Sequence, residues 1–149
     1  MLSFQYSKFS KLPLGLLLEI QEPPSPQALN SLLSRFSGEK HPSRKLVKAL
    51  QNSYCNISIV EQATGKLCGF VRITSDKGLN ANLWDLAAEP GPDQMQLLSI
   101  LVNSALKIIQ KELPGCSISL AAPPIASEIL KRNGFLMDPN GIRVMAYRL

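Results

Sequence analysis

The stretch Leu67–Pro90 reads LCGFVRITSDKGLNANLWDLAAEP, and it decides the fold of this chain. Its first part, Leu67–Thr74, and its later part, Asn82–Ala88, are apolar runs with the β-branched and aromatic residues that favour strands. Between them, Ser75–Leu79 (SDKGL) carries the Asp and Gly that are typical of tight turns. The stretch therefore predicts two antiparallel strands joined by a turn.

The residues before this stretch extend the same pattern. Tyr54–Gln62 alternates apolar and polar residues and predicts a further antiparallel strand, joined to Leu67 through a short turn that contains Gly65. Leu14–Gln21 predicts a strand at the start of the domain. Between these strands we expect two helices. The first begins at Ser25, an N-cap residue followed by proline, and the second begins at Pro42.

The residues after Pro90 predict helices and strands in alternation. Gln94–Leu113 has an apolar stripe at helical spacing and is the clearest helix. Cys116–Ala121 is an apolar strand of the kind buried in a parallel pairing. Pro124–Arg132 is a second helix, which ends at an Asn-Gly pair. Phe135–Met137 and Ile142–Leu149 are expected to close the chain as strands.

These elements indicate one domain spanning residues 1–149. The chain is long enough to bury a core, and its 45% apolar and 18% charged content is typical of a soluble globular protein. The fold class is α/β (α+β). We expect a mixed sheet, antiparallel in its first half and parallel across the long helix, with helices on both faces.

The formal net charge is +5, and the densest basic group is Lys40–Lys48. Aromatic residues form 6% of the chain and do not alternate with these charges, as a surface that stacks nucleic-acid bases would require. We therefore expect a solvated basic face and no nucleic-acid partner. A weaker alternative is attraction of an anionic small ligand such as a nucleotide or coenzyme A.

The three cysteines are Cys55, Cys68 and Cys116, which are far apart and lack a CxxC spacing. They predict free thiols and no metal site. The N-terminal apolar run is broken by Glu19, lacks a cleavage motif and is too short to span a bilayer. We therefore expect no membrane association and a cytoplasmic location. An organelle transit peptide stays open, because no acidic residue precedes Glu19.

Three motifs follow one another in a defined order along the chain. They are Gly69-Phe70-Val71-Arg72 followed by Asp76, Trp84-Asp85 followed by Pro90, and Gly134-Phe135 at the end of a helix that contains Ala126. Together they resemble the GCN5-related N-acetyltransferase (GNAT) family over Tyr54–Phe135, and the first fifty residues match only in the order of elements. The resemblance implies a sheet splayed after its fourth strand, with acetyl-CoA as co-substrate in the opening.

The resemblance also implies which backbone groups would bind acetyl-CoA. A bulge in the fourth strand would expose N–H groups to the thioester carbonyl, and the next helix would direct its N-terminal amides at the pyrophosphate. By position, the first set is Leu86, Ala87 and Ala88, and the second is Asp93, Gln94, Met95, Gln96, Leu97 and Leu98.

The chain departs from the family pattern at four positions. Asp93 stands where the family has Gln or Arg, and Gln96 and Leu98 stand where it has Gly and Gly or Ala. Side chains at these positions hinder close approach of phosphate oxygens to the backbone. Leu130 replaces a tyrosine that often protonates the departing thiolate in the family. The acetyl-CoA-binding motif is thus degenerate.

Glu89 and Asp85 are the carboxylates nearest the expected bulge, and either could deprotonate an amine as catalytic base. Their simpler interpretation is local pairing, or a surface position at the end of a strand. The leading hypothesis is an acetyltransferase that moves an acetyl group from acetyl-CoA to a primary amine of a small molecule or peptide.

The main alternative is a non-catalytic GNAT-fold module that binds or regulates and no longer uses acetyl-CoA normally. An unrelated α/β domain is a remote third hypothesis. The sequence does not specify the acceptor. It leaves a homodimer open, since Ile142–Leu149 could pair between two copies.

Overall fold

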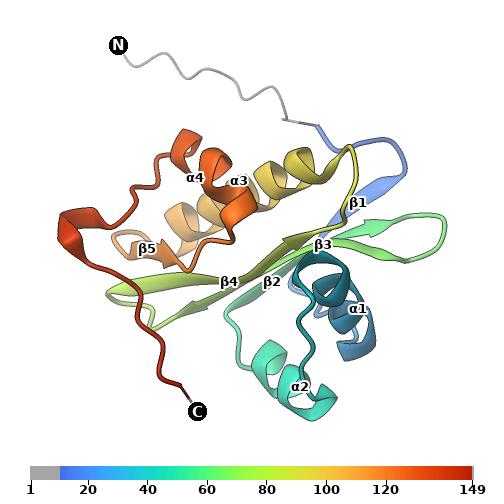
Figure 1. Cartoon of the computed structure of the whole chain (residues 1–149), viewed down its shortest axis with the longest axis horizontal. Coiled ribbons are helices and arrows are strands. Elements are labelled where there is room, and N and C mark those ends of the chain that lie inside the picture. Colours follow the sequence, from blue (N-terminus) through green and yellow to red (C-terminus); the bar gives the residue numbers. More distant parts are fainter. Residues whose placement is uncertain (1–10, 149) are drawn as a thin grey trace.

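The computed structural model describes residues 11–148 of the chain. Figure 1 shows a twisted sheet with helices above and below it. The elements are β1 Leu16–Ile20, α1 Pro26–Ser37, α2 Ser43–Gln51, β2 Cys55–Glu61, β3 Leu67–Ser75, β4 Asn80–Ala88, α3 Gln94–Glu112, β5 Ser117–Leu120 and α4 Ser127–Arg132, with short 3₁₀ turns at Pro124–Ala126 and Pro139–Gly141. All helices and strands predicted before residue 133 are therefore present.

The five strands form one sheet in the order β1-β2-β3-β4-β5. The first three pairings are antiparallel. The last is parallel, from Asn80 opposite Ser117 to Leu83 opposite Leu120. The sheet is thus mixed and antiparallel in its first half, which confirms the predicted fold class.

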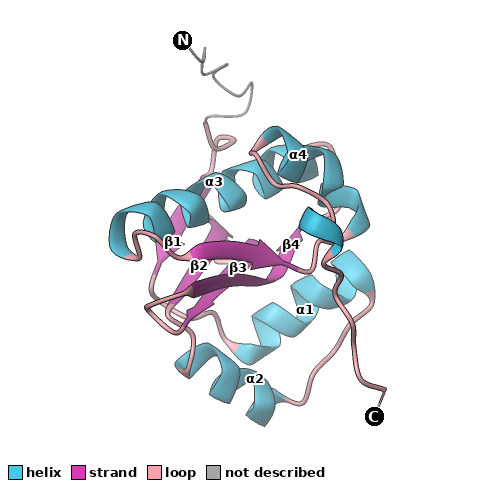
Figure 2. Cartoon of the chain, turned by 90° about the vertical axis from the view of Figure 1, so that its left-hand side faces the viewer, coloured by secondary structure: helices cyan, strands magenta, loops and turns pink. Residues whose placement is uncertain are grey.

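Helices cover both faces of this sheet, as Figure 2 shows. On one face α1 and α2 bury a smaller apolar cluster against β3 and β4, centred on Phe70. On the other face α3 and α4 bury the main core. Gly69 permits the close contact of α3 with the sheet, because a Cβ there would lie 3.1 Å from Leu101 and 3.3 Å from Ile59.

The turn between β3 and β4 is organised by one carboxylate. Asp76 Oδ1 accepts the backbone amides of Gly78, Leu79 and Asn80 at 2.8–2.9 Å. These hydrogen bonds lower the pKa of Asp76 from 3.8 to about 2. The charged carboxylate thus holds the hairpin in register.

The predicted helix ends are also present. Ser25 Oγ accepts the Ala28 amide at 3.1 Å, so Ser25 caps α1, and Pro26 occupies its first position. Gly134 follows α4 with a φ of 91°, in the left-handed region that glycine tolerates.

The prediction of two closing strands was wrong. Phe135–Met137 and residues 142–148 form no strand, and Leu149 lies outside the described residues. Val144 and Met145 are 75% and 92% exposed, so this segment buries little apolar surface. No strand of the described chain pairs with it, and an apolar sequence pattern without a ladder partner does not hold a strand.

The prediction of a strand in parallel pairing at Cys116–Ala121 is confirmed by β5, which pairs with β4, but the expected burial is wrong. The residues of β5 alternate between exposed and half-buried. The reason is that β5 is an edge strand of the described sheet, with a neighbour on one side only.

The three cysteines are free thiols, as predicted, and Cys55 and Cys68 are buried. Within residues 11–148, no helix is both long and apolar enough to cross a membrane. The first ten residues, which bear on the question of a leader segment, lie outside the described residues.

Candidate functional site

A large cleft opens where β4 and β5 part. β5 ends at Leu120 opposite Leu83, while β4 continues to Ala88. A cavity of about 1210 Å³ lies in this region. Its walls include Trp84–Leu86 of β4, the segment after β5, α4 with Leu130, and the C-terminal segment. Leu130 is a buried apolar side chain, so its position contributes no proton chemistry.

A β-bulge lies in β4 at the edge of this cleft. Arg72 pairs with Trp84, whereas Phe70 pairs with Ala87, so both Asp85 and Leu86 lie opposite Val71. Asp85 has a φ of 56°, in the left-handed region that a bulge can require. The bulge begins one residue before the predicted range of Leu86–Ala88.

Beyond the end of β5, backbone groups of β4 have no strand partner on the β5 side. Glu89 donates its amide to Cys68 O at 2.7 Å, on the β3 side. Because backbone groups alternate along a strand, those of Ala88 and Leu86 face the opposite side, where β5 has ended. Consistently, Ala88 O accepts the side-chain amide of Gln94 at 3.1 Å. Of the three predicted residues, Ala87 alone directs its backbone groups toward β3.

The start of α3 lies immediately after this strand end. Leu97 and Leu98 are buried in the main core, so Leu98 does not occupy the place of a phosphate. The Asp93 carboxylate accepts no capping hydrogen bond from the described helix. Gln96 bonds the backbone of Lys11 through its side chain. The first turn of α3 thus presents backbone amides that the nearby Asp93 carboxylate does not cap.

Asp85 is paired with a strand neighbour inside the cleft. Arg72 Nε donates to Asp85 Oδ2 at 2.6 Å, and both side chains are about one-fifth exposed. The Arg72 guanidinium carbon lies 5.9 Å from the centroid of the Trp84 ring. Trp84 donates its indole N–H to Thr74 Oγ1 at 2.7 Å. These four residues form one polar cluster on β3 and β4.

Trp84 does not belong to the apolar core. Its side chain is 42% exposed and lines the cleft. The alternation along β4 explains this, since Leu83 faces the main core and Trp84 faces the opposite side of the sheet.

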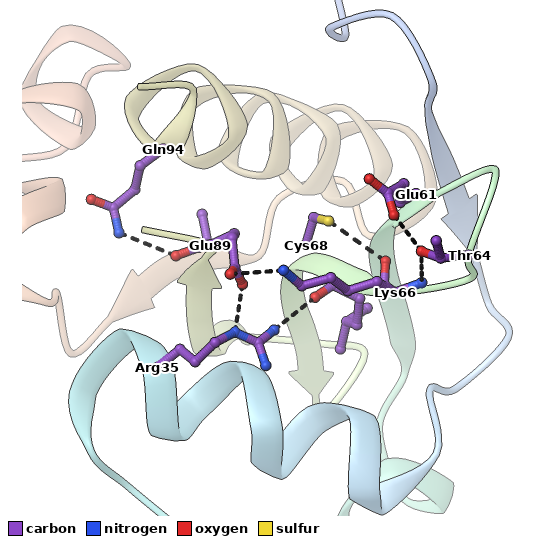
Figure 3. Close-up of polar contacts among 9 residues, drawn as sticks. Arg35, Glu61, Thr64, Lys66, Cys68, Glu89 and Gln94 are labelled. Atoms are coloured by element: carbon purple, nitrogen blue, oxygen red, sulfur yellow. Dashed lines mark hydrogen bonds and ion pairs between the residues drawn. The ribbon is translucent and has the colours of Figure 1, made fainter. Parts of the chain in front are cut away.

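Glu89 has a different environment from Asp85. Figure 3 shows its carboxylate between Arg35 of α1 and Lys66 of the β2–β3 turn, at 2.7 and 3.0 Å. Burial raises the pKa of Glu89, but hydrogen bonds from Lys66 and Arg35 outweigh burial and hold it below its usual range. Glu89 is not among the described residues that line the cleft. Its carboxylate joins α1 to the sheet.

The cationic partners of both carboxylates were missed by sequence reasoning. Arg72 lies 13 positions from Asp85, while Lys66 and Arg35 lie 23 and 54 positions from Glu89. Only the position of Arg72 could have been anticipated from the sequence, because strand alternation places its side chain on the same face of β3 as Phe70. Pairings that depend on a helix crossing a sheet leave no local pattern.

Comparison with known proteins gives relatives of one kind. The chain is 33% identical over 120 residues to a protein of Pyropia yezoensis named uncharacterized N-acetyltransferase ycf52, a match that covers 78% of the chain and 68% of that protein. It is 28% identical over 136 residues to GCN5-related N-acetyltransferase 2, chloroplastic, of Arabidopsis thaliana, covering 78% of the chain and 52% of that protein. No protein-family model matches the chain.

Solved structures show the same fold. A Staphylococcus aureus protein described as a "probable acetyltransferase" superposes with a TM-score of 0.78 at 16% identity, covering 89% of this chain and all of that one. The ribosomal-protein-S18-alanine N-acetyltransferase of Escherichia coli gives a TM-score of 0.65 at 15% identity, covering 80% of this chain and 76% of that one. At these identities the likeness concerns the fold.

Proposed function

Because the chain belongs to the GCN5-related N-acetyltransferase family, we propose that it moves an acetyl group from acetyl-CoA to a primary amine in the cleft between β4 and β5. The observation that carries the proposal is the bulged end of β4. It leaves Leu86 lining a cavity of about 1210 Å³, and β5 has ended before it reaches Leu86 and Ala88.

The cleft fits acetyl-CoA through backbone groups. The thioester supplies an activated acetyl group. In this proposal the amide of Leu86, together with that of Ala88 on the same side of β4, polarises a carbonyl oxygen, as an oxyanion hole does. The first amides of α3 and the helix dipole favour a phosphate there, whereas Asp93 opposes it. Since Leu97 and Leu98 are directed into the core, neither blocks the first turn of α3.

We assign the two predicted bases different roles. Asp85 lines the cleft, and in this proposal it takes a proton from the amine, directly or through water, while the ion pair with Arg72 fixes its orientation. Glu89 lies outside the cleft lining, and both of its carboxylate oxygens bind cations. Its role in this proposal is to hold α1 against the end of β4.

Binding of the co-substrate is tested through Trp84, which is the sole tryptophan of the chain and lines the cleft. Titration with acetyl-CoA and with free CoA should change its fluorescence in a saturable way. A parallel calorimetric titration guards against optical artefacts. Absence of both heat and a fluorescence change at millimolar ligand would contradict the enzyme proposal. Binding without acetyl transfer across an amine panel would favour the non-catalytic alternative.

The proposed base is tested by Asp85→Asn, with Glu89→Gln as the matched change four residues away. We expect Asp85→Asn to lower kcat about 100-fold, since a positioned base typically contributes about 10²–10⁴-fold, with little change in acetyl-CoA affinity. Glu89→Gln should lower thermal stability, and it should lower kcat much less than Asp85→Asn does. Equal kcat losses in the two variants would contradict the division of roles.

The compartment and the oligomeric state stay predictions. The free thiols favour a reducing compartment such as the cytoplasm, whereas the name of the Arabidopsis relative favours the chloroplast. A fluorescent fusion of the full chain decides between them. A homodimer would use the exposed apolar side chains of residues 142–148, and light scattering across a concentration series measures it.

A further inference from the structure

Most of the net charge of the chain lies on one layer of the molecule. Residues 26–51, which form α1, α2 and the loop between them, contain five cations and one acid, Glu39, a formal charge of +4. The whole chain has a formal charge of +5. The cations are Arg35, Lys40, Arg44, Lys45 and Lys48. Figure 2 shows this layer together on one side of the sheet.

Four of these cations are free to bind a partner. Lys40, Arg44, Lys45 and Lys48 are exposed, and no carboxylate of the described residues lies within salt-bridge distance of them. Arg35 alone is committed, to Glu89. We call the four free cations the α1–α2 basic surface.

A shallow, open groove adjoins this surface. It has a volume of about 490 Å³ and lies between α1 and the start of α2, and its lining residues include Ser31, Ser34, Ser43 and the cations Arg35 and Lys40. None of its lining residues is acidic. Two hydrogen bonds between Asn30 and the backbone of His41, at 2.8 and 2.9 Å, hold the loop in place.

The groove and the cleft both lie along α1, with different residues lining each. Ser37 and Glu39 line the cleft, and Lys40, the next residue, lines the groove. A polymer whose end lies in the cleft would therefore meet the α1–α2 basic surface as it leaves. The donor and hydroxyl groups there suit carboxylates.

We infer that the acceptor amine is carried by an acidic polypeptide, whose Asp and Glu side chains bind the α1–α2 basic surface. This inference rests on the proposed function. Nucleic acid fits less well, because Phe36, the one aromatic residue of the segment other than His41, packs against the core and offers no stacking platform. An anionic bilayer fits less well too, since α2 buries Leu46 and Leu50 against the sheet.

Binding is tested apart from transfer, with a short Asp- and Glu-rich fluorescent peptide whose amino groups are blocked. The test variant is Lys40→Glu/Arg44→Glu, which keeps α2 intact because an acid near a helix N-terminus is favourable. The control is Lys107→Glu/Lys111→Glu on α3, with the same charge change on the other face. We expect about tenfold weaker binding for the test variant and less than about twofold for the control.

Three results would overturn the inference. One is an equal loss of affinity for the acidic peptide in the two variants, which would indicate attraction by the overall charge of the chain and not by this surface. The others are tighter binding of a lysine-rich peptide or of an RNA oligonucleotide than of the acidic peptide. Added salt must also weaken the binding of the acidic peptide, as expected for exposed charges.

A transfer assay then addresses the acceptor itself. The ratio of kcat/KM for an acidic peptide to that for a neutral peptide with the same first residue should exceed about ten in the wild type. It should fall toward one in Lys40→Glu/Arg44→Glu, through KM. A wild-type ratio near one would overturn the inference. Absence of transfer to every peptide would contradict the proposed function, and the blocked-peptide binding would still decide whether the surface binds acids.

Discussion

The β3–β4 hairpin and the C-terminal segment 135–148 look alike in sequence but differ in structure. Each contains apolar residues on both sides of a turn with Asp and Gly, SDKGL in the first and DPNGI in the second. In the hairpin, strands pair on each side and helices cover both faces. The C-terminal segment has no strand partner among the described residues, and beyond Phe135, which packs against the main core, its residues are exposed.

The difference teaches that a strand is specified by its neighbours as much as by its own residues. Val71 in β3 is fully buried, while Val144 is 75% exposed. The same side chain thus stabilises one region and contributes little to the other. β5, which could offer an edge to the C-terminal segment, is only four residues long.

The largest expected effect comes from crowding the hairpin. Gly69→Val should lower the free energy of unfolding by about 3 kcal/mol, because its Cβ would lie within 3.1–3.3 Å of Leu101 and Ile59. Urea denaturation measures the loss. The matched control is Gly78→Ala in the turn, where the nearest atom lies 3.9 Å away. A control loss as large as that of Gly69→Val would contradict the packing argument.

The next effect compares one residue type in the two regions. Val71→Ala should cost about 2 kcal/mol through lost burial and a residual cavity, whereas Val144→Ala should change stability by less than about 0.5 kcal/mol. Thermal unfolding of the two variants tests the contrast directly. A loss in Val144→Ala as large as in Val71→Ala would show that the C-terminal segment is packed in solution.

The smallest effect concerns the turn carboxylates. Asp76→Asn should destabilise the hairpin by weakening three charge-assisted bonds, while Asp138→Asn, whose carboxylate only lies 3.6 Å from exposed Arg143, should be neutral. Because folding lowers the pKa of Asp76, its carboxylate contributes its full stabilisation well above pH 3.8. This stabilisation disappears as the pH falls through about 2. Stability curves from pH 5 to pH 2 should therefore converge for wild type and Asp76→Asn. Parallel curves would contradict this assignment.

The fold was predictable wherever local pattern and neighbour agreed. Ser25 and Gly134 mark helix ends through their own chemistry, and the stripe of α3 requires an apolar face to bury. The meander was predictable because consecutive strands pair through short turns. The closing strands failed because their pairing depended on a distant edge.

The candidate site was predictable in its backbone and less so in its side chains. The bulge was expected within one residue of its place, since it belongs to β4 itself. Whether Asp85 or Glu89 faces the cleft depended on the bulge and on α1. The partners Arg72, Arg35 and Lys66 depended on how strands and helices meet.

The sequence by itself determined the family, the mixed sheet and the position of the strand end beside α3, because these follow from periodicity, turns and motifs along the chain. Only the tertiary structure decided that Leu98 belongs to the core, that Trp84 lines the cleft and that Glu89 joins two layers. The direction of a side chain is set by which face the neighbouring elements cover, and that information lies between segments far apart in sequence.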